Sequence, residues 1–216
     1  MDAKKPYLLI CEGDSEFAYV QELNRLLAKC GVPIVFLPHN AGGGGFGNVR
    51  QVCRKLKTKR DGRTFVVADR DIYFRNDKSN GTAYERGKNL VPPFLFQTWN
   101  FEDFLLMHFP PELLAAWRTE ATRSGHVSEP LHRCDYMPVF SEFCAKNDRT
   151  LNFATPYEKG DMPFELQTGH LECLFANNET SAFPHSDFAD FLRRELPNRK
   201  LCGDSWHVSS GENQVW

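Results

Sequence analysis

The chain has 216 residues, of which 41% are hydrophobic and 25% are charged, with a formal net charge of −2. This fits one globular domain with an appended segment and excludes a membrane-spanning protein, because no window approaches the ~20 consecutive apolar residues of a transmembrane helix. The net charge neither indicates nor excludes nucleic-acid binding, because a basic patch can be local. The opening "MDAKKPYLLICEGD" is not typical of a signal peptide. The 7 cysteines lack CxxC spacing, which indicates reduced thiols in the cytoplasm and no zinc site.

Strand and helix patterns alternate in the first half of the chain. Strands are expected at residues 7–11, 33–38, 64–69 and 93–98. Helices are expected at residues 16–29, 48–59 and, in part, 76–89. The strands are nearly continuous apolar runs, which is typical of a sheet buried on both faces. The sequence therefore predicts an α/β fold with a parallel sheet flanked by helices.

The second half of the chain contains no clear strand pattern. Helices are expected at residues 100–109, 111–121, 136–147, 163–177 and 186–196. We therefore expect an α/β core over residues 1–110 and a helical extension packed on it over residues 111–197. Residues 198–216 are polar without a period and are expected to form a peripheral tail.

Acidic residues follow two of the expected strands. Glu12 comes directly after "YLLIC", and the strand "FVVA" leads into Asp69 and Asp71. Ligands of parallel α/β sheets bind at the carboxyl ends of the strands. If these two strands are neighbours, three carboxylates meet at one edge, and like charges that close do not all stay ionised without a cation. Oxygen-rich clusters of this kind suit Mg²⁺ or Mn²⁺. A polar turn without function is the alternative reading of each acid taken alone.

A third acid follows the fourth strand. Glu102 shares a helical face with Leu105 and Leu106, and a carboxylate on an apolar face is costly unless it is paired or bound to a cation. Its alternative role is that of an acid at a helix start, which the helix dipole favours. Asp103 is expected to be solvated, and His108 to be either a packed histidine or an accessory group of the site.

The segment "AGGGGFGN" follows the second expected strand. It lacks the GK[ST] of a Walker A loop and the strand-GxGxxG-helix arrangement of a dinucleotide-binding fold. Two readings stay open: a flexible connection before the next helix, or a loop over the metal site that lets a nucleic-acid backbone pass close to the protein backbone.

Four motifs in order resemble the RloB-like family, a branch of the TOPRIM nucleases. They are "LLICEGDSEFAYVQEL", "VVADRD", "NFEDFLLMHF" and "TPYEKGD". The motif "VVADRD" resembles the DxD strand of TOPRIM domains, and "NFEDFLLMHF" resembles the family's Phe-Glu helix that ends in His-Phe. Residues from Ala182 onward match nothing in that family.

The resemblance implies a TOPRIM fold and Mg²⁺- or Mn²⁺-dependent cleavage of phosphodiester bonds in transfer RNA or DNA. On this pattern Glu12 is a general acid/base or a metal ligand, and Asp69, Asp71 and Glu102 are metal ligands. Lys159 stabilises phosphate charge. Glu16 is an accessory acid or a packing contact. Relatives of this type act in bacterial antiphage systems beside an ABC- or AAA-type ATPase, so such a partner is expected here.

Two other functions stay open from the residues. A phosphatase of the HAD type also uses an hhhhDxD pattern, but it places that pattern on its first strand and not on its third. A regulatory or scaffold subunit that keeps the TOPRIM shell without catalysis is the other alternative.

Overall fold

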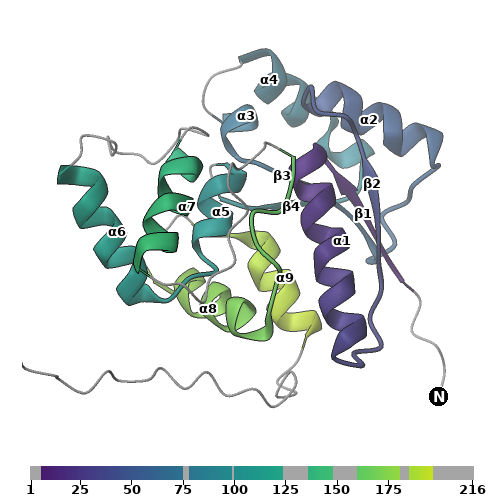
Figure 1. The fold of residues 1–216 in the computed structure, drawn as a ribbon. Helices are drawn as coiled ribbons and strands as arrows, with labels where there is room; N and C mark the ends of the chain where they lie inside the picture. Colours follow the sequence, from purple (N-terminus) through teal and green to yellow (C-terminus); the bar gives the residue numbers. More distant parts are fainter. Residues whose placement is uncertain are drawn as a thin grey trace, which may run out of the picture.

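The computed structural model describes residues 6–74, 78–98, 100–123, 136–147, 160–180 and 185–196. The described part forms one parallel sheet with helices on both faces (Figure 1). No described helix is both long and apolar enough to cross a bilayer. The tail expected from residue 198 onward lies outside the described residues.

The sheet has 4 strands in the order β2-β1-β3-β4, and all the pairings are parallel. The strands are β1 (Tyr7–Cys11), β2 (Phe36–Asn40), β3 (Thr64–Ala68) and β4 (Phe94–Phe96). The predicted α/β class is thus confirmed. The chain leaves β1 to one side for β2 and returns on its other side for β3. Such a reversal of strand order opens a crevice at the carboxyl ends of the two central strands.

Alternate residues of the strands enter two different cores, as the period of a strand requires. Leu9 and Val67 face the larger core, which they share with α1 (Asp14–Lys29). Ile10 and Val66 face a smaller core. The elements over that second face are α2 (Phe46–Lys55), α3 (Asp71–Phe74), α4 (Lys78–Gly87) and η1 (Lys88–Leu90).

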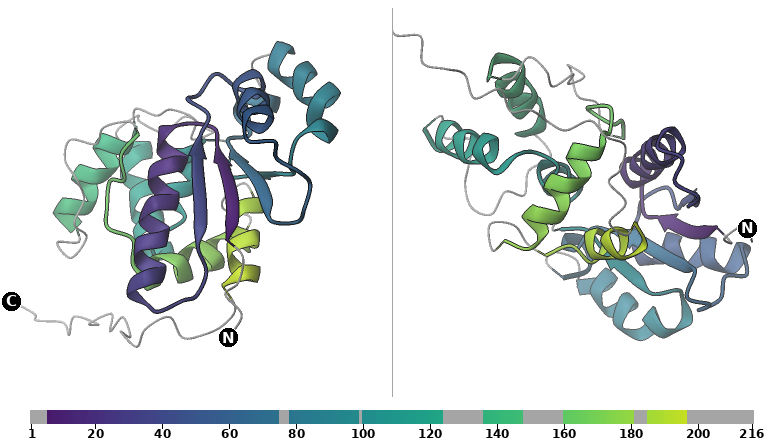
Figure 2. Two further views of the ribbon diagram at one scale, coloured as in Figure 1. Left: turned by 90° about the vertical axis from the view of Figure 1, so that its right-hand side faces the viewer. Right: turned by 90° about the horizontal axis from the view of Figure 1, so that it is seen from below.

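The second half of the chain is helical where the structure describes it (Figure 2). Its helices are α5 (Phe101–Leu106), α6 (Pro111–Arg123), α7 (Tyr136–Asn147), α8 (Thr168–Asn178) and α9 (Asp187–Glu195). Buried side chains of all five, such as Trp117 and Phe191, join the larger core beside the sheet. Phe191 of α9 packs edge-on against the ring of Tyr7, with ring centroids 5.4 Å apart.

The second strand begins later than the sequence indicates. We expected residues 33–38, but β2 starts at Phe36. Ile34 N donates to Val32 O at 2.9 Å, so residues 32–34 form a tight turn that cannot join the ladder.

Several helix bounds also differ from those expected, among them the starts of α2 and α8. The helix α2 begins two residues earlier than expected and ends at Lys55, near Lys57, whose φ of 51° does not continue a right-handed helix. The helix α8 begins at Thr168 and not at residue 163. Leu166 N donates to Glu22 Oε1, so its amide serves a long-range contact.

The outer edge of β2 is protected against pairing with another strand. The side chain of Asn24 bonds both backbone groups of Phe36, at 2.7 and 2.9 Å. Pro38, two residues on, has no N–H to donate. Proteins blunt edge strands by such means, so this edge does not extend the sheet.

Candidate metal and phosphate site

Glu12 lies at the carboxyl end of β1, against β3. Its backbone N–H donates to Val67 O at 3.0 Å, so the peptide that follows the strand still belongs to the ladder. The side chain is only 3% exposed. The tertiary pairing of β1 with β3 therefore places this acid beside the DxD turn, as the sequence predicted on the condition that the two strands are neighbours.

The DxD turn begins where β3 ends. Asp69 follows Ala68, and Asp71 opens α3. Arg70 N donates to Thr98 O at 3.1 Å, which ties the turn to the segment after β4. The Arg70 guanidinium leaves the acids and pairs with Asp187 of α9 at 3.4 Å. The arginine between the two aspartates therefore does not neutralise them.

Glu102 is placed by the start of α5. The Asn100 side chain caps this helix by accepting a hydrogen bond from Asp103 N at 2.8 Å. Glu102 is 2% exposed and reaches the same pocket as the other acids. The expectation that Asp103 is solvated was wrong: it is also 2% exposed, because α5 is buried on all sides.

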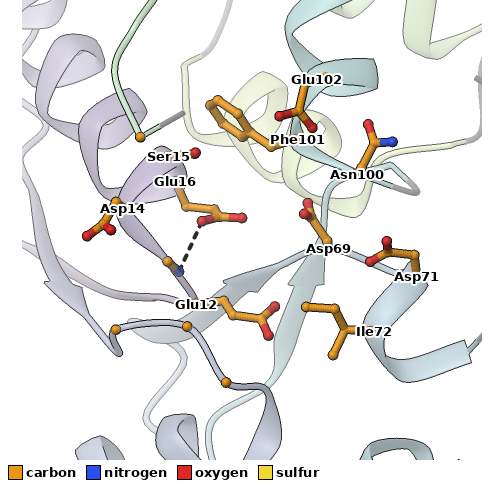
Figure 3. A pocket seen from close by; sticks show the side chains of 15 residues that line it. Glu12, Asp14, Ser15, Glu16, Asp69, Asp71, Ile72, Asn100, Phe101 and Glu102 are labelled. Carbon is orange, nitrogen blue, oxygen red and sulfur yellow. Dashed lines mark hydrogen bonds between the residues drawn. The ribbon is translucent and has the colours of Figure 1, made fainter. Parts of the chain in front are cut away.

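These acids surround a pocket of about 450 Å³. Figure 3 shows five carboxylates around one common space, those of Glu12, Glu16, Asp69, Asp71 and Glu102. The remaining described residues of the lining are Gly13, Asp14, Ser15, Gly42, Gly43, Gly44, Ile72, Asn100, Phe101 and Gly160. No lysine or arginine occurs in this described lining, so its side chains offer only negative charge.

Glu16 and Asp14 come from the first turn of α1. Glu16 Oε2 accepts from Gly13 N at 3.0 Å and so caps the helix while facing the pocket. Asp14 accepts a hydrogen bond from Asn40 and is turned to the side. Sequence reasoning missed Asp14 as a lining residue, although the spacing "EGDSE" at a strand end was a signal for it.

Burial and mutual repulsion hold protons on this cluster. Desolvation and then the Glu16 charge raise the pKa of Glu12 from its ordinary 4.5 to about 8. The Tyr73 hydroxyl and the Asp69 N–H act in the opposite direction, but neither forms a well-aligned hydrogen bond, and both Glu12 carboxylate oxygens are buried without a partner. The pKa of Asp69 is also raised well above its usual range, by burial and then by Glu16 and Glu12.

The donor chemistry of the pocket fits a hard divalent cation. All the candidate ligands are carboxylates, the group that Mg²⁺ and Mn²⁺ prefer. The buried oxygens of Glu12 and Asp69 Oδ1 lack hydrogen-bond partners, and a cation would satisfy them. Among the described residues, no three His, Cys, Asp or Glu side chains are yet arranged to hold a metal ion.

One predicted site residue, His108, lies away from the pocket, and another lies outside the described residues. His108 is fully buried: its Nδ1–H donates to Phe104 O at 3.0 Å, and its Nε2 accepts from the Tyr19 hydroxyl at 2.9 Å. Burial lowers the pKa of His108 to about 3, so it is a neutral packed histidine. Lys159 lies outside the described residues, although Gly160, the next residue, lines the pocket.

No family model, curated protein or solved structure matches this chain.

Proposed function

We propose that this protein is a Mg²⁺- or Mn²⁺-dependent nuclease of TOPRIM type that hydrolyses phosphodiester bonds. One observation carries the proposal: buried and half-buried acids that follow three adjacent parallel strands line one pocket at the switch in strand order. Four carboxylates from three parts of the chain are costly to bring together in such a pocket without a cation. Glu12, whose buried oxygens have no partner, makes this case most directly.

Asp69, Asp71 and Glu102 would hold the ion, with Glu12 as a further ligand or as the group that transfers a proton. A divalent ion held there supplies charge for the phosphate oxygens and lowers the pKa of a bound water. A carboxyl group with a pKa near 8 exchanges a proton at neutral pH, which suits general acid/base catalysis. Lys159, next to the lining residue Gly160, would stabilise charge on the phosphate.

The biological setting follows from the motif resemblance alone. We propose that the substrate is transfer RNA or DNA and that the nuclease acts in the cytoplasm as the toxic effector of a bacterial antiphage system. The same resemblance leads us to propose an ABC- or AAA-type ATPase as the partner that controls it.

A cleavage assay tests the proposal. The purified chain is incubated with Mn²⁺ or Mg²⁺, with EDTA as control, on plasmid DNA and on total transfer RNA. We expect metal-dependent cleavage by the wild type and by Glu172→Gln, whose side chain is exposed on α8. We expect none by Glu12→Gln or Asp69→Asn. Full activity of either folded pocket variant would contradict the proposed site.

The alternatives give different results in the same assay. A regulatory subunit would cleave neither substrate, and its effect on a partner would persist in Asp69→Asn. A HAD-type phosphatase would hydrolyse small phosphate esters through a phospho-aspartate. The position of the DxD turn after β3 and not after β1 disfavours that alternative.

A further inference from the structure

The glycine-rich loop beside the pocket, residues 42–45, is held in place by hydrogen bonds. Gly43 N donates to Glu12 O at 2.7 Å, and Gly42 N donates to Asn40 Oδ1 at 2.7 Å. Asn48 Nδ2 donates to Gly43 O at 2.7 Å. The loop is thus fixed to the backbone of the buried acid, and Gly42, Gly43 and Gly44 line the pocket. It is a built wall of the pocket and not only a connection.

Unpaired backbone donors follow along this loop. The N–H groups of Gly44, Gly45, Phe46 and Gly47 have no acceptor among the described residues. They lead into α2, a helix of 10 residues, whose N-terminus carries roughly half a positive charge. Successive free N–H groups at such a position bind anions, and phosphates above all. Of these four residues, Gly44 lines the pocket. The N-terminus of α1 also reaches the lining, but Glu16 caps it and Asp14 lies in its first turn, so acids offset its positive end.

Packing explains only part of the glycine run. A Cβ on Gly44 would lie 2.8 Å from Asn48 Nδ2, and one on Gly45 would lie 2.5 Å from Asn80 Nδ2. A Cβ on Gly42 or Gly43 would meet nothing within 4 Å. At these two positions the bare backbone therefore faces open space in the pocket, where a ligand can approach it closely.

The acid beside the loop points to the same ligand. Glu12 is 97% buried, since its exposed fraction is 3%, and both of its carboxylate oxygens lack partners. A cation would satisfy such a carboxylate. If that cation lies between the carboxylates and the free N–H groups, an anion can bind between the cation and the N–H groups. A phosphate bound to the metal would fill that position.

We propose that the glycine loop is the subsite for a phosphate group of the substrate. The N–H groups that stay free, beginning with that of Gly44 in the pocket lining, bond the non-bridging oxygens of one phosphodiester, while the carboxylates of the pocket hold the divalent ion. The inference rests on the proposed function and deepens it, because it assigns the part of the pocket that recognises the nucleic-acid backbone. Recognition through N–H groups and phosphate oxygens carries no base specificity, so sequence preference must come from elsewhere.

Two glycines of matched geometry provide the test. Gly43 has φ of 72° and Gly62 has φ of 73°, and a Cβ on either would meet nothing within 4 Å. Alanine thus brings the same backbone strain and no clash at both positions, but only Gly43 lines the pocket. Gly42→Ala, with φ of 75°, is a second loop variant. Urea unfolding of each variant verifies that the fold is kept.

Binding is measured by fluorescence anisotropy of a labelled oligonucleotide, as DNA and as RNA, with Ca²⁺ in place of the catalytic ion. We expect Gly43→Ala to raise the Kd about tenfold, the usual effect of losing ~1.4 kcal/mol of binding, and Gly62→Ala to leave it unchanged. Mn²⁺ affinity, measured by calorimetry, stays within about twofold in both variants, because the carboxylates are untouched.

The outcomes separate the subsite from the nuclease assignment. An unchanged Kd in Gly43→Ala, or no binding of either oligonucleotide by the wild type, overturns the subsite. If the wild type binds oligonucleotide in a Gly43-dependent way but never binds Mn²⁺, the subsite stands and the metal-dependent nuclease fails. If Mn²⁺ affinity falls together with oligonucleotide affinity in Gly43→Ala, the loop supports the metal site and the phosphate role is wrong.

Discussion

Replacing Glu12 by glutamine removes an ionisable group that the fold buries at a high cost. Burial and the neighbouring Glu16 raise the pKa of Glu12 from 4.5 to about 8. An acid with a raised pKa in the folded state destabilises the protein progressively as the pH rises from the unfolded value through the folded one. Without metal, the wild type should therefore lose stability between about pH 4.5 and about pH 8 relative to Glu12→Gln.

The magnitude follows from the size of the shift. At 1.36 kcal/mol per pKa unit, the raised pKa of Glu12 destabilises the folded state by about 1 kcal/mol at about pH 5 and by about 4 kcal/mol at about pH 7.5, because the folded state keeps a proton that the unfolded state releases. The advantage of the glutamine variant should therefore grow by about 3 kcal/mol between these two pH values. Any constant cost of burying the amide cancels in this difference. Asp69 increases this pH-dependent advantage of Glu12→Gln further, because the raised pKa of Asp69 depends in part on the Glu12 charge.

Urea unfolding in EDTA at the two pH values measures the free energies of unfolding. Glu172→Gln is the control, because its side chain is exposed and its replacement should give nearly the same difference from the wild type at both pH values. If the glutamine variant at Glu12 gains no more than the control, Glu12 is not a desolvated acid and the electrostatic reasoning about the pocket is wrong. In Mn²⁺ the wild type should be more stable than Glu12→Gln, because the wild type alone keeps the full set of metal ligands.

Four further results are expected. Mn²⁺ affinity should rise about tenfold from about pH 6.5 to about pH 7.5, because binding displaces the proton of Glu12. Titration calorimetry in buffers of different ionisation enthalpy measures how many protons are released on binding. Binding without proton release would contradict the prediction. Tyr19→Phe should lower stability by about 1–2 kcal/mol by leaving His108 Nε2 without its donor, with unchanged Mn²⁺ binding. Gly45→Ala should lower the free energy of unfolding in urea by about 2 kcal/mol or more, because φ is 72° and the new Cβ meets Asn80. A variant as stable as the wild type would show that Asn80 of α4 moves aside at little cost. Lys159→Ala should reduce cleavage at least about tenfold while leaving Mn²⁺ affinity unchanged, and equal losses of both would refute a role confined to the phosphate.

Local sequence patterns were sufficient for the elements and for the edge at which the site lies. Each strand is a short apolar run, and each acid that follows one is adjacent to it in the chain, so Glu12 and Asp69 were placed at strand ends without any tertiary information. The parallel sheet follows from the alternation with helices. Strand starts were less certain, as β2 showed, because a turn hydrogen bond and not hydrophobicity decides where the ladder begins.

Only the tertiary structure decided which acids meet and in what environment. The order β2-β1-β3-β4 makes β1 and β3 neighbours, and no local pattern encodes that order. The pairing of Arg70 with Asp187 spans 117 residues, yet it keeps the Arg70 guanidinium from neutralising the DxD acids. The burial that raises the pKa of Glu12, the pocket wall at Gly160 and the enclosure of His108 likewise arise from segments distant in the chain, because desolvation depends on everything packed around a group and not on its sequence neighbours.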